Sequence, residues 1–512
     1  MQGIGSSTSL WTATAPAPPF PPLAGQAQTD VCVIGAGIAG LTAAYLLLRE
    51  GKQVIVIDAE DVGAGESGRT TAHFFPPDER YCEIQRRFGG HAAQQVADSS
   101  RCAIALVEAI VQREKIACAW QRLDGYLVAA LAAHQPLIER EYQAARQLEL
   151  EVELLPRVPG LREWDTGPCL RFAGQAQFHP LRYLNGLADA IARLGGRIHG
   201  ATRAHDISGD SVWQSVATAQ GEIGARAVVV ATNTPFNDRL VMHTKLAAYR
   251  SHVLGLRVAR QQLPSMLLWD TGQPYYYVRL AGDAADTAYD VLIVGGQDHK
   301  VGQDARGEAR YDAIEAWARL RFPMLREVVW RWSGTVMEPA DGLPYLGHNP
   351  MDGKNVFVIT GDSGNGMTHC TAGAMLVTDL IMERPNPWAG LYEPARTPLH
   401  GLGELVLEQA NTMAQYADWA RQGQVESVDQ IAPGQGALLR DGVRLLAVHR
   451  TRQGGLLALS AACPHMGCAV HWNGQEQSWD CPCHGSRFGI DGKVLHGPAA
   501  TGLAPAALPP AP

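Results

Sequence analysis

Two cysteine and histidine pairs near the C-terminus are the residues whose types and spacing most directly suggest chemistry. Cys463 and His465 lie in C-P-H-M-G-C, and Cys481 and His484 lie in C-P-C-H-G-S. Two hairpin tips that each offer one thiolate and one imidazole can hold a [2Fe-2S] cluster, with the cysteines on one iron and the histidines on the other. Neutral imidazoles in place of thiolates raise the potential to roughly −150 to +300 mV. A Cys2His2 zinc site is the alternative, but such sites usually separate their cysteines by about two to four residues.

This pattern resembles the Rieske box, in which C-x-H is followed by fifteen residues and C-x-x-H. The resemblance implies that Cys468 and Cys483 form the disulfide that joins the two loops in Rieske proteins of cytochrome bc complexes. It also implies that Ser486 donates a hydrogen bond to a cluster sulfur. Phe488 stands where high-potential members have a tyrosine whose hydroxyl bonds to a ligand sulfur. Because that donor is missing, we expect an intermediate potential.

A glycine-rich turn near the N-terminus is the second motif that suggests chemistry. Gly35, Gly37 and Gly40 follow the G-x-G-x-x-G spacing between the apolar runs 31–34 and 54–57, and Asp58 ends the second run. In a strand, turn, helix and strand unit, these glycines allow a tight turn, close approach of a pyrophosphate and packing of helix on strand. The acid can accept a hydrogen bond from a ribose hydroxyl. The spacing therefore predicts a dinucleotide site, the alternative being a glycine-rich turn in an ordinary βα unit.

Strand alternation over 275–279 predicts that Tyr275, Tyr277 and Arg279 share one face. Two phenols and a guanidinium could hold a substrate carboxylate, although a sheet with one solvated face has the same pattern. His299 and Lys300 could form a proton-transfer or oxygen-facing pair, but a polar turn is the simpler interpretation.

The elements that must position these residues fall into four parts. Residues 1–28 read as an extended lead-in, 29–385 as an α/β Rossmann-like dinucleotide domain with an α+β substrate domain, 386–424 as a linker and helix, and 425–506 as a small all-β domain. The dinucleotide domain is expected from about 29–90, 170–235 and 335–385, and the substrate domain from about 91–169 and 236–334. Helices are expected at 91–115, 134–150, 184–194 and about 403–421, and buried strands at 227–232 and 355–360.

Residues 6–385 resemble the FAD-dependent oxidoreductases of the D-amino-acid-oxidase-like superfamily, which includes glycine oxidase, sarcosine oxidase and gamma-glutamylputrescine oxidoreductase. The resemblance rests on S-L-W-T-A-T-A-P, the glycine triplet with its acid, S-G-R-T-T-A-H, D-G-L-P-Y-L-G and T-G-D-S-G-N-G-M-T, in this order. It implies FAD and oxidation of a C–N bond by hydride transfer to the flavin. It places the glycine triplet and Asp58 at the ADP half of FAD, and His73 is a candidate for covalent attachment. The residues implied to lie near the flavin are Ser67, Gly68, Arg69, Thr70, Thr71, Gly361, Gly364, Gly366 and Met367.

Composition limits the partners. A net charge of −8 over 512 residues gives no reason to expect nucleic acid. Neither a secretory signal nor a transmembrane segment is predicted, so the cytoplasm is the default location. Six cysteines stand singly and four lie within the C-terminal cluster, which suggests metal before structural disulfides in an intracellular chain. No second complete G-x-G-x-x-G with its acid appears, which argues against a built-in NAD(P)H domain.

Together these features predict a dehydrogenase that oxidises an amine or amino acid. Electrons would pass singly from reduced FAD to the Rieske cluster and on to an external one-electron partner, since a flavin handles two electrons and a cluster one. An oxidase that uses oxygen, with the cluster as a sensor or staple, is one alternative. An electron-transfer protein without a small-molecule substrate is the other.

Overall fold

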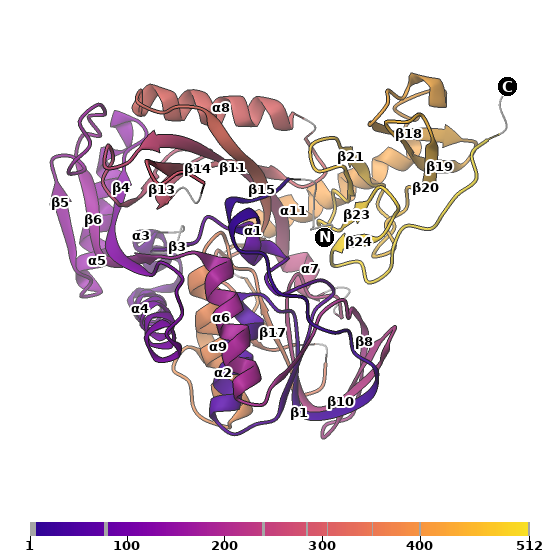
Figure 1. Ribbon diagram of the computed structural model, residues 1–512, viewed down its shortest axis with the longest axis horizontal. Helices are drawn as coiled ribbons and strands as arrows, with labels where there is room; N and C mark the ends of the chain where they lie inside the picture. The colour runs from indigo at the N-terminus through magenta and orange to yellow at the C-terminus, as the bar shows by residue number, and fades with distance from the viewer. Residues whose placement is uncertain are drawn as a thin grey trace.

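In the computed structural model, the described residues are 7–75, 80–237, 241–282, 285–304, 306–350, 352–398 and 401–509. They form two large sheets with flanking helices and a smaller all-β lobe (Figure 1). The predicted fold class is confirmed. Among the described residues, no helix is both long and apolar enough to cross a bilayer.

The first sheet carries the glycine turn. Its parallel centre consists of β1 (Gly25–Ile34) between β10 (Gly221–Asn233) and β2 (Val54–Ile57). The β1, β2 and β10 segments are rich in Val and Ile, as expected of strands buried on both faces. Parallel strands end at a common edge, which here gathers Gly35, Thr232 and Thr360. The remaining strands are β7 (Arg197–His199), β8 (Ala204–Gly209), β9 (Gln214–Thr218), β16 (Tyr345–His348) and β17 (Val356–Thr360).

Three helices cover one face of this sheet (Figure 1): α2 (Ile38–Arg49), α6 (Pro180–Arg193) and α9 (Gly366–Ile381). α2 begins directly after the glycine turn, and Leu41, Ala44 and Leu47 on it are fully buried in the main hydrophobic core. Burial of these apolar side chains holds the helix against β1, so its N-terminus stays aimed at the edge where the strands end.

The second sheet forms the lobe at the upper left of Figure 1. It follows the order β15-β11-β14-β13-β12-β4-β6-β3, with β5 beside β6. Helix α8 (Gly307–Arg321) covers one face, while α3 (Tyr81–Phe88), α4 (Gly90–Glu114) and α5 (Gln135–Gln147) pack together beside the other part of the sheet. The strands are β3 (His73–Phe74), β4 (Gln121–Val128), β5 (Val152–Leu155), β6 (Cys169–Gln177), β11 (Leu246–Ala259), β12 (Leu267–Asp270), β13 (Tyr276–Gly282), β14 (Tyr289–Lys300) and β15 (Val328–Pro339).

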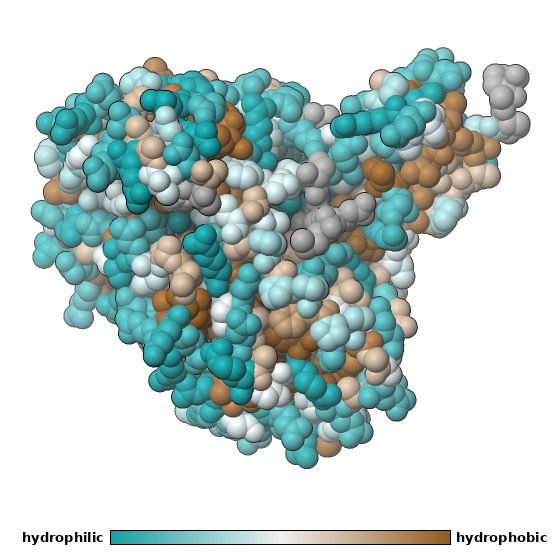
Figure 2. Space-filling model, viewed as in Figure 1, coloured by the Kyte–Doolittle hydropathy of each residue, from teal (hydrophilic) through white to brown (hydrophobic). Residues whose placement is uncertain are grey.

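The C-terminal part folds as two small antiparallel sheets. One contains β18 (Gly436–Asp441), β19 (Arg444–Arg450) and β20 (Leu456–Ser460), and the other contains β21 (His471–Asn473), β22 (Ser478–Asp480), β23 (Arg487–Gly489) and β24 (Val494–His496). The helices α10 (Ala389–Tyr392) and α11 (Leu402–Gln415) precede them. Figure 2 shows this part projecting from the molecule, with hydrophobic residues gathered on the side that carries β18 to β20.

Two predicted segments differ from the structure in detail. Residues 170–177 belong to β6 of the second sheet rather than to the first, because β6 pairs with β4, and β3 joins the same sheet. The lead-in contains a short helix, α1 (Leu10–Thr14), whose Leu10 and Trp11 are each 2% exposed. Trp11 donates from Nε1 to the Thr70 carbonyl at 2.6 Å, so the lead-in is packed rather than merely extended. Residues 1–6 lie outside the described part.

Candidate functional site

The glycine turn lines a deep cleft at the edge of the first sheet. Gly35 has φ +111°, and a Cβ there would lie 2.3 Å from the Ala231 carbonyl oxygen. A Cβ on Gly37 would lie 2.9 Å from Ser67 Oγ, and one on Gly40 would lie 1.8 Å from the Gly35 carbonyl oxygen. Gly40 therefore serves packing and does not line the cleft, whereas Gly35 and Gly37 do. The turn leaves a cradle that a side chain would fill, as a bound pyrophosphate requires.

Asp58 closes one end of this cleft. Its Oδ2 accepts from Ala36 N at 2.6 Å and its Oδ1 accepts from Glu60 N at 2.8 Å. Burial raises the pKa of Asp58, and these two backbone bonds and the nearby Arg203 act in the opposite direction. The carboxylate is thus fixed at the end of β2, where the sequence predicted a partner for ribose.

The turn before α9 lines the other part of the cleft. Gly364, Gly366 and Met367 are among its lining residues, whereas Gly361 packs against Leu246 and Pro339 behind it. Asp362 also lines it, and burial raises its pKa to about 7. Among the described residues, Oδ1 of Asp362 is buried and has no hydrogen-bond partner. A ligand that donates a hydrogen bond would satisfy this atom, so the residues present fit a bound flavin dinucleotide.

The 67–71 segment divides into two roles. Ser67, Arg69, Thr70 and Thr71 line the cleft, and Ser67 Oγ accepts from Ile38 N at 3.0 Å. A Cβ on Gly68 would lie 2.4 Å from the Gly63 carbonyl oxygen, so that glycine is required for packing. The guanidinium of Arg69 forms a buried ion pair with Glu476.

His73 is 4% exposed and lines the cleft. Its Nδ1 lies 3.0 Å from Thr71 Oγ1 and its Nε2 lies 3.2 Å from the Val278 carbonyl oxygen. Burial, and then the charge of Arg279, lower the pKa of His73 to about 3, so its imidazole is neutral. Covalent attachment of FAD at His73 remains a prediction, and it would require one ring nitrogen to give up a bond to the protein.

The predicted substrate trio is only partly brought together. Tyr275 and Tyr277 line the cleft with their ring centroids 5.4 Å apart. Arg279 lies further along the same strand face, where its Nη1 donates to the carbonyls of Thr71, Ala72 and Phe178 at 3.0, 2.7 and 3.1 Å. The alternation was correct, but the 71–73 segment covers that end of the face. Arg279 therefore holds this segment and does not line the cleft.

His299 does not line the cleft. Its ring stacks on His252 with centroids 5.2 Å apart, and burial, then Arg310 and Arg250, lower its pKa to about 4. Lys300 forms an ion pair with Glu408 of α11 at 2.6 Å. Lys300 thus contacts the C-terminal part of the chain, whereas His299 packs within the second sheet, so the two do not form the predicted pair at the cleft.

A proton-accepting group that the sequence did not reveal lies beside Tyr277. Its phenol oxygen is 2.7 Å from Ser251 Oγ, and Ser251 lines the cleft. Burial raises the pKa of Asp298 to about 6, and a hydrogen bond from Ser251 opposes this shift. Ser251 is therefore hydrogen-bonded to the Tyr277 phenol and also lowers the pKa of the buried Asp298 carboxylate.

The four predicted cysteine and histidine ligands converge at the tips of two loops. The Cys463 loop is closed by Gly467 N donating to the Cys463 carbonyl at 2.8 Å, and the Cys481 loop by Gly485 N donating to the Cys481 carbonyl at 3.1 Å. The rings of His465 and His484 lie perpendicular with centroids 5.0 Å apart. Two imidazoles side by side, next to two thiols, fit the donor set of a [2Fe-2S] centre with histidines on one iron.

The thiols of this set are themselves in contact. A hydrogen bond from the Cys481 thiol lowers the pKa of Cys463, and Ser486 acts in the same direction. Burial lowers the pKa of His484 to about 4, which keeps its imidazole neutral and able to bind metal. The placement of Ser486 beside Cys463 is what a hydrogen bond to cluster sulfur requires.

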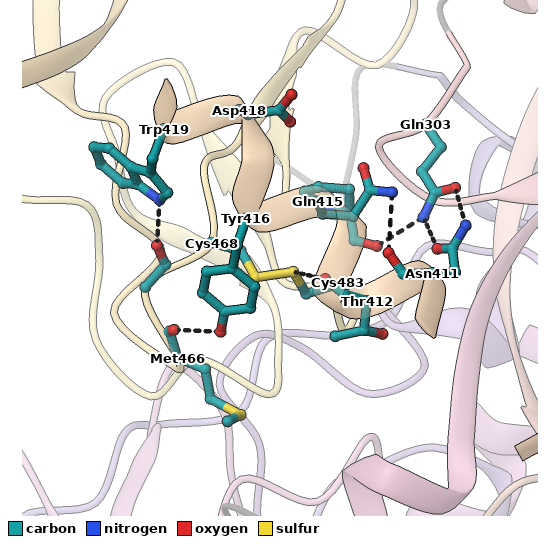
Figure 3. The surroundings of a disulfide bond; sticks show 12 residues. Gln303, Asn411, Thr412, Gln415, Tyr416, Asp418, Trp419, Met466, Cys468 and Cys483 are labelled. Atoms are coloured by element: carbon teal, nitrogen blue, oxygen red, sulfur yellow. Dashed lines mark hydrogen bonds between the residues drawn. A yellow bond between two sulfur atoms is a disulfide. The ribbon is translucent and has the colours of Figure 1, made fainter. Parts of the chain in front are cut away.

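The predicted disulfide between Cys468 and Cys483 is confirmed (Figure 3). The ligand atom of Cys481 lies within 4.8 Å of both disulfide sulfurs, so the bridge directly supports a ligand loop. The segment after α11 braces the other loop: Tyr416 Oη donates to the Met466 carbonyl at 2.7 Å, and Trp419 Nε1 donates to the Gly467 carbonyl at 2.9 Å (Figure 3).

The imidazole side of this centre faces the first two sheets. His243, from α7 (Val241–Lys245), lies with its ring centroid 4.6 Å from that of His465 and 5.8 Å from that of His484. A Cβ on Gly485 would lie 2.4 Å from the Cβ of Ala248 on β11, so the backbone of the ligand loop touches that strand.

Buried ion pairs also join the first two sheets to the C-terminal part of the chain. Arg69 binds Glu476 at 3.0 Å, Arg250 binds Asp480 at 3.2 Å, and Arg487 binds Asp480 at 3.1 Å, all with side chains at most 6% exposed. Burial alone would raise the pKa of Glu476, but the charges of Arg69, Arg487 and Arg250 hold it below its usual range. The sequence offered no signal for this network because each residue stands alone in the chain.

Comparison with known proteins agrees with both sites. Residues 30–380 match the family described as FAD dependent oxidoreductase, and residues 419–507 match the Rieske [2Fe-2S] domain. The chain is 30% identical over 498 residues to the Rieske 2Fe-2S iron-sulfur protein YhfW of Bacillus subtilis, with 96% of each chain covered. It is 27% identical over 383 residues to gamma-glutamylputrescine oxidoreductase of Escherichia coli, covering 71% of this chain and 86% of the relative.

A solved structure extends the comparison. Glycine oxidase from Geobacillus kaustophilus superposes with a TM-score of 0.61 at 21% identity, covering 72% of this chain and 99% of that protein. At this identity the likeness concerns the fold. Both sites agree with both domain matches, so the two cofactors are FAD and a [2Fe-2S] cluster. The Rieske match also rejects the alternative of a Cys2His2 zinc site. The chain belongs to the FAD dependent oxidoreductase family and carries a Rieske domain at its C-terminal end.

Proposed function

We propose that this protein is a dehydrogenase that oxidises the C–N bond of an amine or amino acid and passes the electrons through its Rieske centre to an external one-electron acceptor. When bound, FAD accepts two electrons from a substrate and can release them one at a time, whereas the cluster carries one. The residues that would hold FAD line the cleft, and Cys463, His465, Cys481 and His484 would hold the cluster.

One observation carries this proposal: the Rieske domain contributes part of the wall of the FAD cleft. Residues 495–497, 499 and 500 of the Rieske domain line the FAD cleft. Ala499 N donates to Ser486 Oγ at 3.1 Å, and Ser486 lies beside Cys463. A single hydrogen bond thus connects the cleft wall to the ligand loop. Because electron transfer slows steeply with distance, such proximity favours a relay over two independent functions.

The relatives support the choice of substrate class. Gamma-glutamylputrescine oxidoreductase and glycine oxidase are named for an amine and an amino acid. In this chain, Tyr275 and Tyr277 present phenols to the cleft, and the buried Asp298 carboxylate can serve as the acceptor of a proton from a substrate ammonium. An amine must lose that proton before it can give up a hydride, so a buried carboxylate with a pKa near 6 suits the reaction.

Anaerobic mixing with a panel of amines and amino acids tests this function. We expect one class of substrate to bleach the flavin absorbance, followed by the paramagnetic signal of the reduced cluster. His484→Ala should remove the cluster signal and leave flavin bleaching intact. Rapid peroxide release by that variant in air would instead identify an oxidase. If no compound of the panel bleaches the flavin while a reduced electron-carrier protein does, the chain is an electron-transfer protein.

A further inference from the structure

The Rieske domain contributes a wall to the FAD cleft, and that wall is built from polar contacts. Arg203, which lines the cleft beside Asp58, donates from Nη2 to the Val494 carbonyl at 2.9 Å. His496 follows in the same strand, β24, and is 7% exposed. The segment therefore approaches the dinucleotide cleft at the edge that also carries the ribose-binding acid.

His496 is held between two residues of the FAD domain. Its Nε2 lies 3.2 Å from Thr234 Oγ1, directly after β10, and its Nδ1 lies 3.9 Å from Glu66 Oε1, just before the 67–71 segment. All three residues line the cleft. Burial is the main cause that lowers the pKa of His496 to about 4, so a neutral imidazole stands in the wall. Such a side chain can exchange hydrogen bonds with the hydroxyl or phosphate groups of a dinucleotide.

The same segment is tied to the cluster loop at its other end. Beyond His496 the chain runs to Ala499, whose N–H donates to Ser486 Oγ at 3.1 Å. Arg487 pairs with His496 between β23 and β24 and is bound to Asp480 within the buried charge network. The position of the wall is therefore coupled to the docking of the whole Rieske domain.

We propose that the Rieske domain completes the FAD-binding site, with His496 as a FAD-contacting residue, so that FAD binding and docking of the Rieske domain stabilise each other. A ligand that contacts both domains binds the docked arrangement more tightly than the open one, and by linkage it favours docking. This inference depends on FAD binding alone and does not depend on the substrate or the direction of electron flow.

The test uses the full-length protein, from which FAD is removed and added back while flavin fluorescence is followed. Loss of a hydrogen-bonding group at the ligand should weaken FAD binding roughly 3- to 10-fold in His496→Ala. His205→Ala is the matched control, because His205 is an exposed histidine on β8 outside the cleft, and its affinity for FAD should equal that of the native chain. A measured content of about two iron atoms per chain shows that the Rieske domain of each variant is intact.

A second measurement separates a direct contact from a folding defect. In the native protein, addition of FAD should slow backbone hydrogen exchange in residues 494–500, which lie more than 400 positions from the glycine turn in sequence. The proposal would be overturned if His496→Ala bound FAD with unchanged affinity, or if hydrogen exchange in residues 494–500 were the same with and without FAD. Either result would leave the proposed dehydrogenase function standing, since flavin reduction by an amine is measured separately.

Discussion

The buried charge network predicts that docking of the Rieske domain weakens when one carboxylate is neutralised. Glu476 and Asp480 face Arg69, Arg250 and Arg487, so the native network has two negative and three positive groups. Glu476→Gln keeps the size of the side chain but leaves one carboxylate among three guanidinium groups. Removing one partner of a buried ion pair costs about 3 to 5 kcal/mol, because the remaining charge stays out of water. We expect the lower end, since the glutamine can keep its bond from Ser333 Oγ, now 2.6 Å from Glu476 Oε1.

Hydrogen exchange followed by mass spectrometry measures this change in the docking equilibrium. A loss of about 3 kcal/mol should lower protection of the 494–500 amides roughly 100-fold, while amides in β1 remain protected. Glu153→Gln is the control, because Glu153 is 57% exposed in its ion pair with Arg171, and it should stay within about 0.5 kcal/mol of the native chain. If Glu476→Gln lowers protection no more than Glu153→Gln does, the network does not hold the domains together.

The network also predicts the pH at which docking weakens. The folded-state pKa of Glu476 lies below its unfolded value, which is about 4.3. Its contribution is therefore fully present above pH of about 4.3 and is lost as the pH falls toward the folded pKa. Protection of the 494–500 amides should fall in acid in the native chain, and this dependence should be weaker in Glu476→Gln.

Three further predictions concern the two sites. Phe488→Tyr should raise the midpoint potential of the cluster, because a phenol could donate to a ligand sulfur; voltammetry that shows an unchanged or lower potential would contradict this. Asp298→Asn should remove the limb of kcat/KM that rises with pH around pH 6, because the base acts only when deprotonated; a limb that persists in the variant would assign the base elsewhere. Cys468→Ser together with Cys483→Ser should destabilise the cluster-free Rieske domain by about 3 kcal/mol, since the bridge spans 15 residues; equal thermal stability of the cluster-free native and variant chains would show that the bridge is not a staple.

Much of the fold was predictable because its signals are local. The expected helices at 91–115, 134–150 and 184–194 correspond to Gly90–Glu114, Gln135–Gln147 and Pro180–Arg193. The expected strands at 227–232 and 355–360 lie within β10 and β17. The periodic pattern of apolar residues and the glycine or proline residues at element ends are local signals of a few residues each. They can therefore be recognised in the sequence before the tertiary contacts are known. The sheet to which β6 belongs could not be predicted, because strand pairing depends on contacts between residues that lie far apart in the chain.

Residue spacing by itself predicted a dinucleotide site and an iron-sulfur centre with cysteine and histidine ligands, whereas the choice of FAD rested on the family resemblance and the domain match. The four predicted cluster ligands occupy two loops of a few residues each, and the glycine turn occupies a single βα connection, so the backbone geometry of each is set by neighbours in sequence. Only the tertiary structure decided which other side chains serve these sites. Arg69 pairs with Glu476 across 407 positions, and His496 meets Thr234 across 262. Such partners are chosen by how whole domains pack, and packing over that separation leaves no periodicity or spacing in the chain from which it could be inferred.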